Sequence, residues 1–294
     1  MIRQKTIYCG RGWRPRYKEV DIYTFAERPR NRRARRGKKS SAVQEKLNDN
    51  NSRRYLNQLV KANFSNSDYR VDLTYDSENM PGTEEDANRM VSNYLKKIKR
   101  ERSKRGLDAL KYIWVNEQGE SGRIHHHLLV NGGIDRDTME AMWSFRRRKG
   151  EKEPRRIGYT RVEPLRFARN GIDGLVVYMT KETFKQEEET EGQLSFGDIY
   201  EGKELILTDL LVSTPHGKKR WKQSQNLIKP HERTRDRAYS RRQIQKLVSM
   251  PSDCEEVRSF FARRFEGYEI DTVRYRYNDV TACWSIYLTM HRRD

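Results

Sequence analysis

Three adjacent histidines, His125, His126 and His127, are the side chains of this chain best suited to hold a metal ion. They lie in the segment RIHHHLLVN, residues 123–131, which is typical of a strand. Because successive strand side chains face opposite ways, His125 and His127 share one face and His126 points to the other. Two imidazoles roughly 7 Å apart by strand geometry can converge on one cation. A histidine run that binds no metal is the alternative interpretation.

A third ligand for such an ion should come from a neighbouring strand. Glu117 ends the preceding strand of a predicted hairpin and is the nearest carboxylate, with Glu120 and Asp72 as alternatives. Two imidazoles and one carboxylate leave open positions on the ion, which suits Mn²⁺, Mg²⁺ or another divalent cation that polarises a phosphate.

Tyr178 and Lys181 form a second pair with chemical potential. They lie three positions apart in the predicted helix 172–182, and therefore on one helical face. A tyrosine hydroxyl is a weak nucleophile that becomes useful beside a metal-bound phosphate. The alternative for this pair is an amphipathic contact at the edge of the core.

The elements that must position these residues follow a regular order. Thr83 with Asp86 predicts a capped helix start, and Gly106 predicts its end. The order is β-α-β-β-α-β-α, which predicts an α+β fold with an antiparallel sheet, close to the ferredoxin-like or RNA-recognition-like plan. The predicted elements are strand 67–75, helix 83–105, strands 111–116 and 123–131, helix 135–144, strand 159–165 and helix 172–182.

Charge points to a polyanionic partner. The chain has 61 Lys and Arg against 42 Asp and Glu, a net charge of +19, and residues 28–39 hold eight basic residues in twelve. Such a surface favours nucleic acid, because phosphate contacts release counterions. No membrane partner is expected: no stretch approaches the roughly 18 apolar residues of a span. The N-terminus lacks the apolar region of a secretory signal, and three distant cysteines indicate a reducing, cytoplasmic setting.

Composition also divides the chain into four predicted regions. These are a basic N-terminal arm with a helix (1–64), the core (65–186), a linker with a basic segment (187–231) and a small α/β accessory region (232–294). The last region contains predicted helices at 240–248 and 252–265, then two strands around 278–279. Trp221 and Trp13 could each stack on a base or pack on the core. The residues expected to contact DNA are Arg32, Arg33, Arg35, Arg36, Lys38, Lys39, Arg146, Arg147, Arg148, Lys219, Arg220 and Trp221.

Three segments together resemble the motifs of HUH endonucleases. They are LTY (73–75), WVNEQGESGRIHHHLLV (114–130) and YMTK (178–181). More narrowly, they resemble rolling-circle replication initiators (Rep) of bacterial plasmids and phages. This resemblance implies that His125, His127 and Glu117 are the metal ligands, that Tyr178 is the nicking tyrosine and that Lys181 assists it.

The resemblance also implies the reaction. Tyr178 would attack single-stranded DNA at an origin hairpin, leaving a 5′-phosphotyrosine link and a free 3′-OH, with Mn²⁺ or Mg²⁺ as cofactor. The positions four away from Tyr178 are Gly174 and Glu182, which indicates a single-tyrosine enzyme. The chain has no Walker A sequence, so a host helicase would unwind the DNA and a host polymerase would extend it, in the cytoplasm of a bacterial cell. The alternatives are a single-strand transposase or relaxase of the same superfamily, and a non-catalytic nucleic-acid-binding protein.

Overall fold

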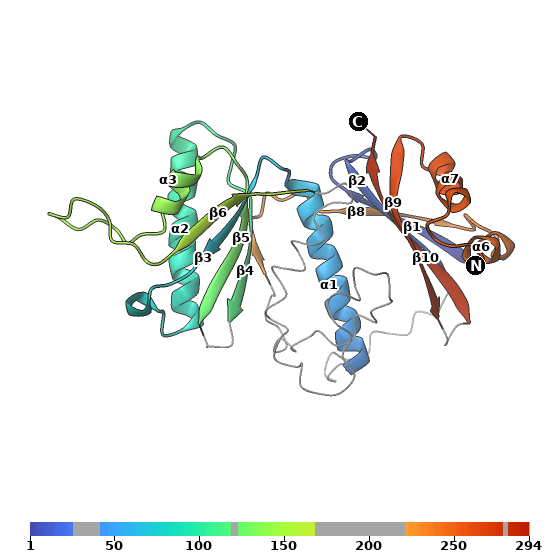
Figure 1. The fold of residues 1–294 in the computed structure, drawn as a ribbon, viewed down its shortest axis with the longest axis horizontal. Coiled ribbons are helices and arrows are strands. Elements are labelled where there is room, and N and C mark those ends of the chain that lie inside the picture. Colours follow the sequence, from blue (N-terminus) through green and yellow to red (C-terminus); the bar gives the residue numbers. More distant parts are fainter. Residues whose placement is uncertain (26–41, 119–122, 168–220, 279–281, 294) are drawn as a thin grey trace.

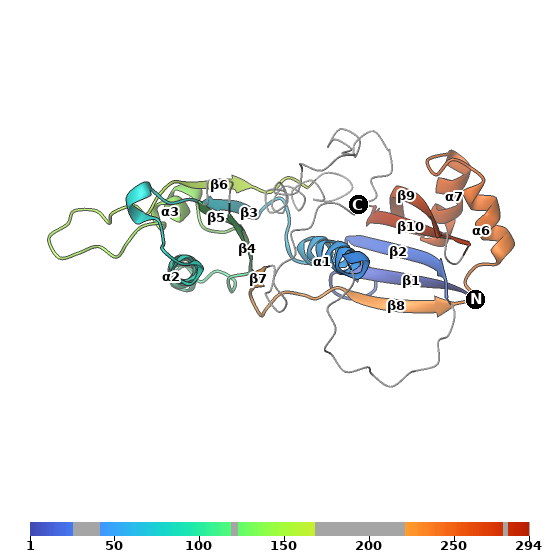
Figure 2. The same ribbon diagram turned by 90° about the horizontal axis from the view of Figure 1, so that it is seen from below.

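The computed structural model describes residues 1–25, 42–118, 123–167, 221–278 and 282–293. They form two five-stranded antiparallel sheets. The core sheet has the strand order β6-β3-β5-β4-β7, and the terminal sheet, built from both ends of the chain, has the order β8-β1-β2-β10-β9. Helix α1 (Ala42–Asn63) lies between the two sheets (Figures 1 and 2).

The core sheet has the element order predicted from the sequence, so the α+β class and the ferredoxin-like core are confirmed. Helix α2 begins after Thr83, whose hydroxyl accepts a hydrogen bond from the N–H of Asp86 at 3.1 Å. The helix predicted at 172–182 lies outside the described residues. The elements are β3 (Tyr69–Leu73), η1 (Ser77–Asn79), α2 (Glu84–Lys104), β4 (Tyr112–Gln118), β5 (Ile124–Val130), α3 (Arg136–Ala141), β6 (Thr160–Pro164) and β7 (Lys222–Gln223).

Alternation along the strands gives the core sheet one apolar face for α2 and α3. Val71, Trp114 and Leu128 are buried there against Tyr94 of α2 and Met139 of α3. The opposite face carries apolar residues only where α1 covers it. The polar remainder of that face is therefore free to hold a functional site.

The terminal sheet corrects the prediction that residues 1–64 begin with a basic arm. Residues 2–24 form β1 (Ile2–Cys9) and β2 (Tyr17–Thr24), two paired strands inside the sheet. Charged residues alternate with apolar ones in both strands, so the high average charge concealed the strand pattern. The most basic part of the predicted arm, within residues 26–41, lies outside the described residues.

The predicted boundaries after the core also change. β7, inside the expected linker of 187–231, pairs with β4 at the edge of the core sheet. The expected boundary at 231/232 falls inside β8 (His231–Asp236), which pairs with β1. The accessory region is therefore completed by the first strands of the chain.

Within that region, both predicted helices and the predicted strand pair are found. They are α6 (Arg241–Val248), α7 (Glu255–Arg264), β9 (Tyr268–Asn278) and β10 (Cys283–Arg292). The two helices cover one face of the terminal sheet (Figure 2). Val20 and Ile22 of β2 are buried beneath them beside Ile286 and Leu288 of β10, so the two ends of the chain share one core.

Helix α1 packs on both sheets with different sides. Leu56, Leu59 and Val60 are buried against Ile113 and Leu129 of the core sheet. Toward the terminal sheet the same helix presents polar side chains. Among the described residues, no helix is both long and apolar enough to cross a membrane.

An ion-pair network joins α1 to the terminal sheet. The guanidinium of Arg54 donates to both oxygens of Asp21, at 2.8 and 2.6 Å, and to Oε2 of Glu19 at 2.9 Å. Gln58, one turn further along, donates to the same Glu19 oxygen at 2.7 Å. Both carboxylates are buried, so they depend on these donors for the solvation that water would otherwise supply.

We expect Arg54→Ala to lower the free energy of unfolding by about 2 kcal/mol, because it leaves two buried carboxylates close together with fewer donors. Urea unfolding measures this change. Arg89→Ala is the matched control, since Arg89 forms an exposed i,i+3 pair with Asp86 and should change stability by about 0.5 kcal/mol or less. Equal effects of the two substitutions would contradict the structural role of the network.

Candidate functional site

The β4–β5 hairpin brings the predicted metal ligands onto one face of the core sheet. His125 pairs directly across the hairpin with Glu117, and His127 is two residues further along the same face of β5. On the next strand, Asp72 of β3 pairs with His127. The prediction that His125 and His127 share a face is confirmed.

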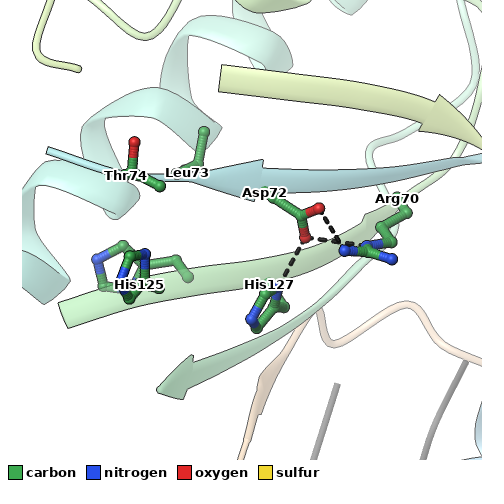
Figure 3. A pocket seen from close by; sticks show the side chains of 7 residues that line it. Arg70, Asp72, Leu73, Thr74, His125 and His127 are labelled. Atoms are coloured by element: carbon green, nitrogen blue, oxygen red, sulfur yellow. Dashed lines mark hydrogen bonds and ion pairs between the residues drawn. The ribbon is translucent and has the colours of Figure 1, made fainter. Parts of the chain in front are cut away.

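His127 is held between two carboxylates. Its Nε2 lies 2.5 Å from Oε2 of Glu117, and its Nδ1 lies 2.6 Å from Oδ1 of Asp72. Asp72 in turn accepts hydrogen bonds from the guanidinium of Arg70 at 3.0 and 2.5 Å, as Figure 3 shows. Burial alone would lower the pKa of His127, but the hydrogen bonds and negative charges of Asp72 and Glu117 raise it to about 9. In the metal-free protein this imidazole therefore carries a proton at neutral pH.

Glu117 contains an unsatisfied acceptor. Its side chain is 1% exposed, and its Oε1 is buried without a hydrogen-bond partner. A buried carboxylate oxygen without a donor is costly, unless a cation or a moved side chain completes it. The neighbouring His125 is half-buried, and burial lowers its pKa, which favours the neutral imidazole that binds metals.

The donor types of this face fit a divalent cation, but they are not yet arranged around one point. Within the described residues, no group of three His, Cys, Asp or Glu side chains converges as a metal site. The hydrogen bond between His127 and Glu117 uses the very atoms that would bind an ion, so loading requires His127 to release a proton. Asp72 lies on the Nδ1 side of the ring, where a carboxylate orients a metal-binding histidine. The alternative ligand Glu120 lies outside the described residues.

A small hollow opens beside these residues. It has a volume of about 250 Å³ and is lined by Arg70, Asp72, Thr74, His125 and His127, among others (Figure 3). The hollow thus combines a guanidinium, two imidazoles and a carboxylate. This mixture suits a phosphate group held together with a cation.

His126 serves the opposite face. It is completely buried, with Nε2 2.7 Å from the hydroxyl of Tyr75 and Nδ1 2.8 Å from Oδ1 of Asn116. Burial, reinforced by the charges of the adjacent histidines, lowers the pKa of His126 to about 3. The ring is therefore neutral, accepting from Tyr75 and donating to Asn116.

The other predicted site residues are distributed as follows. Tyr178, Lys181, Lys219, Arg220 and the arm residues Arg32, Arg33, Arg35, Arg36, Lys38 and Lys39 lie outside the described residues. Arg146, Arg147 and Arg148 are exposed on a loop between α3 and β6 that projects away from the sheet (Figure 1). Trp221 is partly buried on the apolar cluster under α1, with its ring 6.4 Å from that of Tyr55.

Sequence reasoning missed three residues that shape this site. Arg70 holds Asp72, and Tyr75 and Asn116 hold His126. Arg70 could have been found, because it lies two positions before Asp72 and hence on the same strand face. The roles of Tyr75 and Asn116 depend on the packing of helix against sheet, which has no local signal.

Comparison with known proteins gives a family match for the core. Residues 68–183 match the model of a family of replication-associated proteins, the ORF2 type. The matched region contains β3 to β6 and extends past Lys181, so it includes the whole face described above. No curated protein and no solved structure matched the chain. The match covers less than half of the chain, and it associates the core with DNA replication.

We expect His126→Ala to lower the free energy of unfolding by roughly 2–4 kcal/mol, because it opens a cavity and leaves Tyr75 and Asn116 without their partner. His125→Ala is the matched control on the adjacent, half-buried position and should cost less than about 1 kcal/mol. Both values come from urea unfolding in the presence of a chelator. A larger loss for His125→Ala would show that the two histidines have been assigned to the wrong faces.

Proposed function

We propose that this protein is a rolling-circle replication initiator that nicks and rejoins single-stranded origin DNA. The observation that carries the proposal is the polar face of the core sheet, where His125, His127 and Glu117 lie together inside the region matched to replication-associated proteins. The unsatisfied oxygen of Glu117 and the neighbouring Arg70–Asp72 pair support a role in binding a cation and a phosphate.

A divalent cation, Mn²⁺ or Mg²⁺, held by His125, His127 and Glu117 would supply electrophilic polarisation of the scissile phosphate. Asp72 would accept the Nδ1 proton of His127 and so keep Nε2 directed at Glu117. Arg70 fixes Asp72 and adds positive charge beside the hollow. These contacts hold the phosphate-binding side chains in place before DNA arrives.

Tyr178 is the proposed nucleophile. Its oxygen attacks the scissile phosphorus, the bond from phosphorus to the 3′ oxygen breaks, and the departing 3′ oxygen takes up a proton. One phosphodiester is exchanged for one phosphotyrosine ester, so the later rejoining needs no ATP. Lys181, one helical turn from Tyr178, would orient the phosphate or offset charge near the tyrosine.

The surroundings of the reaction follow from the same proposal. Exposed cations such as Arg146–Arg148, and the basic arm, would contact the backbone of the origin hairpin. Because the sequence contains no Walker A motif, a host helicase would open the duplex and a host polymerase would extend the 3′-OH.

Tyr178→Phe should abolish the covalent protein–DNA adduct, lowering its yield by more than roughly a thousandfold, because phenylalanine lacks the attacking oxygen. The assay incubates labelled single-stranded oligonucleotides that tile the origin with protein and Mn²⁺, then resolves adducts on a denaturing gel. Tyr159→Phe is the control, since that tyrosine is 66% exposed and lies in the same region. DNA binding should remain in both variants.

Two outcomes of this assay would contradict the proposal. An unchanged adduct yield with Tyr178→Phe would overturn the assignment of the nucleophile. If the wild-type protein forms no adduct with any oligonucleotide yet binds them, the non-catalytic binding protein becomes the better assignment.

Glu117→Gln should weaken Mn²⁺ binding by at least roughly tenfold, because an amide oxygen is a poorer ligand than a carboxylate oxygen. Titration calorimetry and the metal-induced rise in unfolding temperature measure binding without any turnover. Glu101→Gln is the control, since Glu101 pairs with Arg105 on the surface of α2. Equal Mn²⁺ affinity of both variants would remove Glu117 from the ligand set.

A further inference from the structure

Three aromatic rings gather on one end of the terminal sheet, in a part of the chain outside the matched region. Tyr8 of β1 stacks on His231 of β8, with ring centroids 5.0 Å apart and planes inclined by 10°. Trp13, in the loop between β1 and β2, stands edge-on to both rings at 5.0 and 5.1 Å. The indole is 57% exposed, the largest exposure of any tryptophan in the described residues. Its free surface is available for a further ring.

Cations surround these rings. The ammonium of Lys18 lies 5.2 Å from the centre of the Tyr8 ring, and the guanidinium of Arg233 lies 5.8 Å from that of Trp13. Arg11 and Arg14, on either side of Trp13 in the loop, are exposed. Burial, and the nearby charge of Arg14, lower the pKa of Lys18, which reflects the positive potential of this end of the sheet.

Strand β8 separates its charges between its two faces. Glu232 pairs with Lys5 at 2.5 Å, and Asp236 pairs with Arg3 at 2.6 Å, so its acidic side chains are neutralised within the sheet. The intervening Arg233 alternates onto the face of His231, is exposed, and has no carboxylate partner among the described residues. The aromatic face of β8 is therefore the cationic face.

The loop that carries Trp13 is held in a fixed conformation. The carbonyl of Pro15 accepts a hydrogen bond from the Tyr268 hydroxyl at 2.6 Å, and the carbonyl of Arg16 accepts one from the N–H of Arg292 at 2.7 Å. Gly10 begins the loop with φ +146, and a Cβ there would lie 2.9 Å from Cβ of Pro15. A fixed aromatic side chain binds with a smaller loss of conformational entropy than a mobile one.

We propose that Tyr8, Trp13, Lys18, His231 and Arg233 form an aromatic–cation platform that binds single-stranded DNA, with a base stacked on Trp13 and phosphates held by Arg233 and its neighbours. Single-stranded binding sites combine such rings with cations, because an unpaired base offers its flat face while its phosphates need counter-charges. A duplex keeps its bases stacked inside and would leave the exposed indole without a role. The platform does not depend on the proposed cleavage chemistry.

The position of the loop connects the platform with the core. Arg11 lines a hollow of about 750 Å³ together with Arg102, Lys111, Asn131 and Asn226, which belong to the core or its β7 connection. DNA on the platform is therefore bound beside the junction of the two sheets. Such a site would retain a strand independently of the residues that cut it.

The test is an affinity measurement on the full chain, with labelled oligothymidylate and fluorescence anisotropy in the presence of a chelator. Trp13→Ala should weaken binding roughly 5- to 50-fold, and Trp13→Phe should retain most of the affinity, because a ring remains to stack. Arg233→Ala should also lower the dependence of log affinity on log salt by about 0.7. Trp284→Ala is the matched control, an exposed tryptophan at the other end of the same sheet, and should bind like wild type.

The outcomes separate this proposal from its rivals. Unchanged affinity with Trp13→Ala, or an equal loss with Trp284→Ala, would overturn it. Equal or tighter wild-type binding to a duplex of the same length would also overturn it, since charge alone would then explain the affinity. The chelator prevents cleavage, so failure of the adduct assay leaves this result intact, and failure here leaves the adduct assay intact.

Discussion

The register of β5 is the constraint on which the site depends. One strand supplies His126 to the core and His125 and His127 to the opposite face, so a slip of one residue would exchange the two sets. Neighbouring imidazoles are thereby given opposite states: His126, buried with neutral partners, has a pKa lowered to about 3, whereas His127, between two carboxylates, has a pKa raised to about 9. The hydrogen bonds of His126 to Tyr75 and Asn116 satisfy it only in this register, so the core fixes the geometry of the site.

The positive charge of the chain is used for two different purposes. Some cations stabilise the fold: Arg54 solvates two buried carboxylates beneath α1, and the buried Arg102 donates to the carbonyls of Asp108, Asn131 and Gly132. Others, such as Arg146–Arg148 and Arg233, are exposed and available to a polyanion. Net charge therefore identifies the class of partner, whereas only the structure separates the cations that bind from the cations that fold.

Local signals predicted what is local. The Thr83 cap, the alternation of β3 and the β4–β5 hairpin follow from neighbouring residues, and so does the division of the histidines between two faces. The terminal sheet was missed, because β1 pairs with β8 more than two hundred residues away, and no pattern within either strand names its partner. The same limit applies to the site. That Asp72 and Glu117 both reach His127 depends on the register of three strands, and that Glu117 keeps an unsatisfied oxygen depends on the packing around it.

The topology also explains how two surfaces with separate tasks can hold a fixed spacing. The terminal sheet places β1 and β2 between β8 and β10, so it closes only when both ends of the chain are present. The core needs shorter-range pairings and carries the polar face within a single segment. Two connections join the sheets: α1, packed on both, and the short segment from β7 to β8, which starts on the core edge and ends at His231. Because both connections are ordered, the aromatic rings and the imidazoles are set at a distance that the fold, rather than a flexible linker, determines.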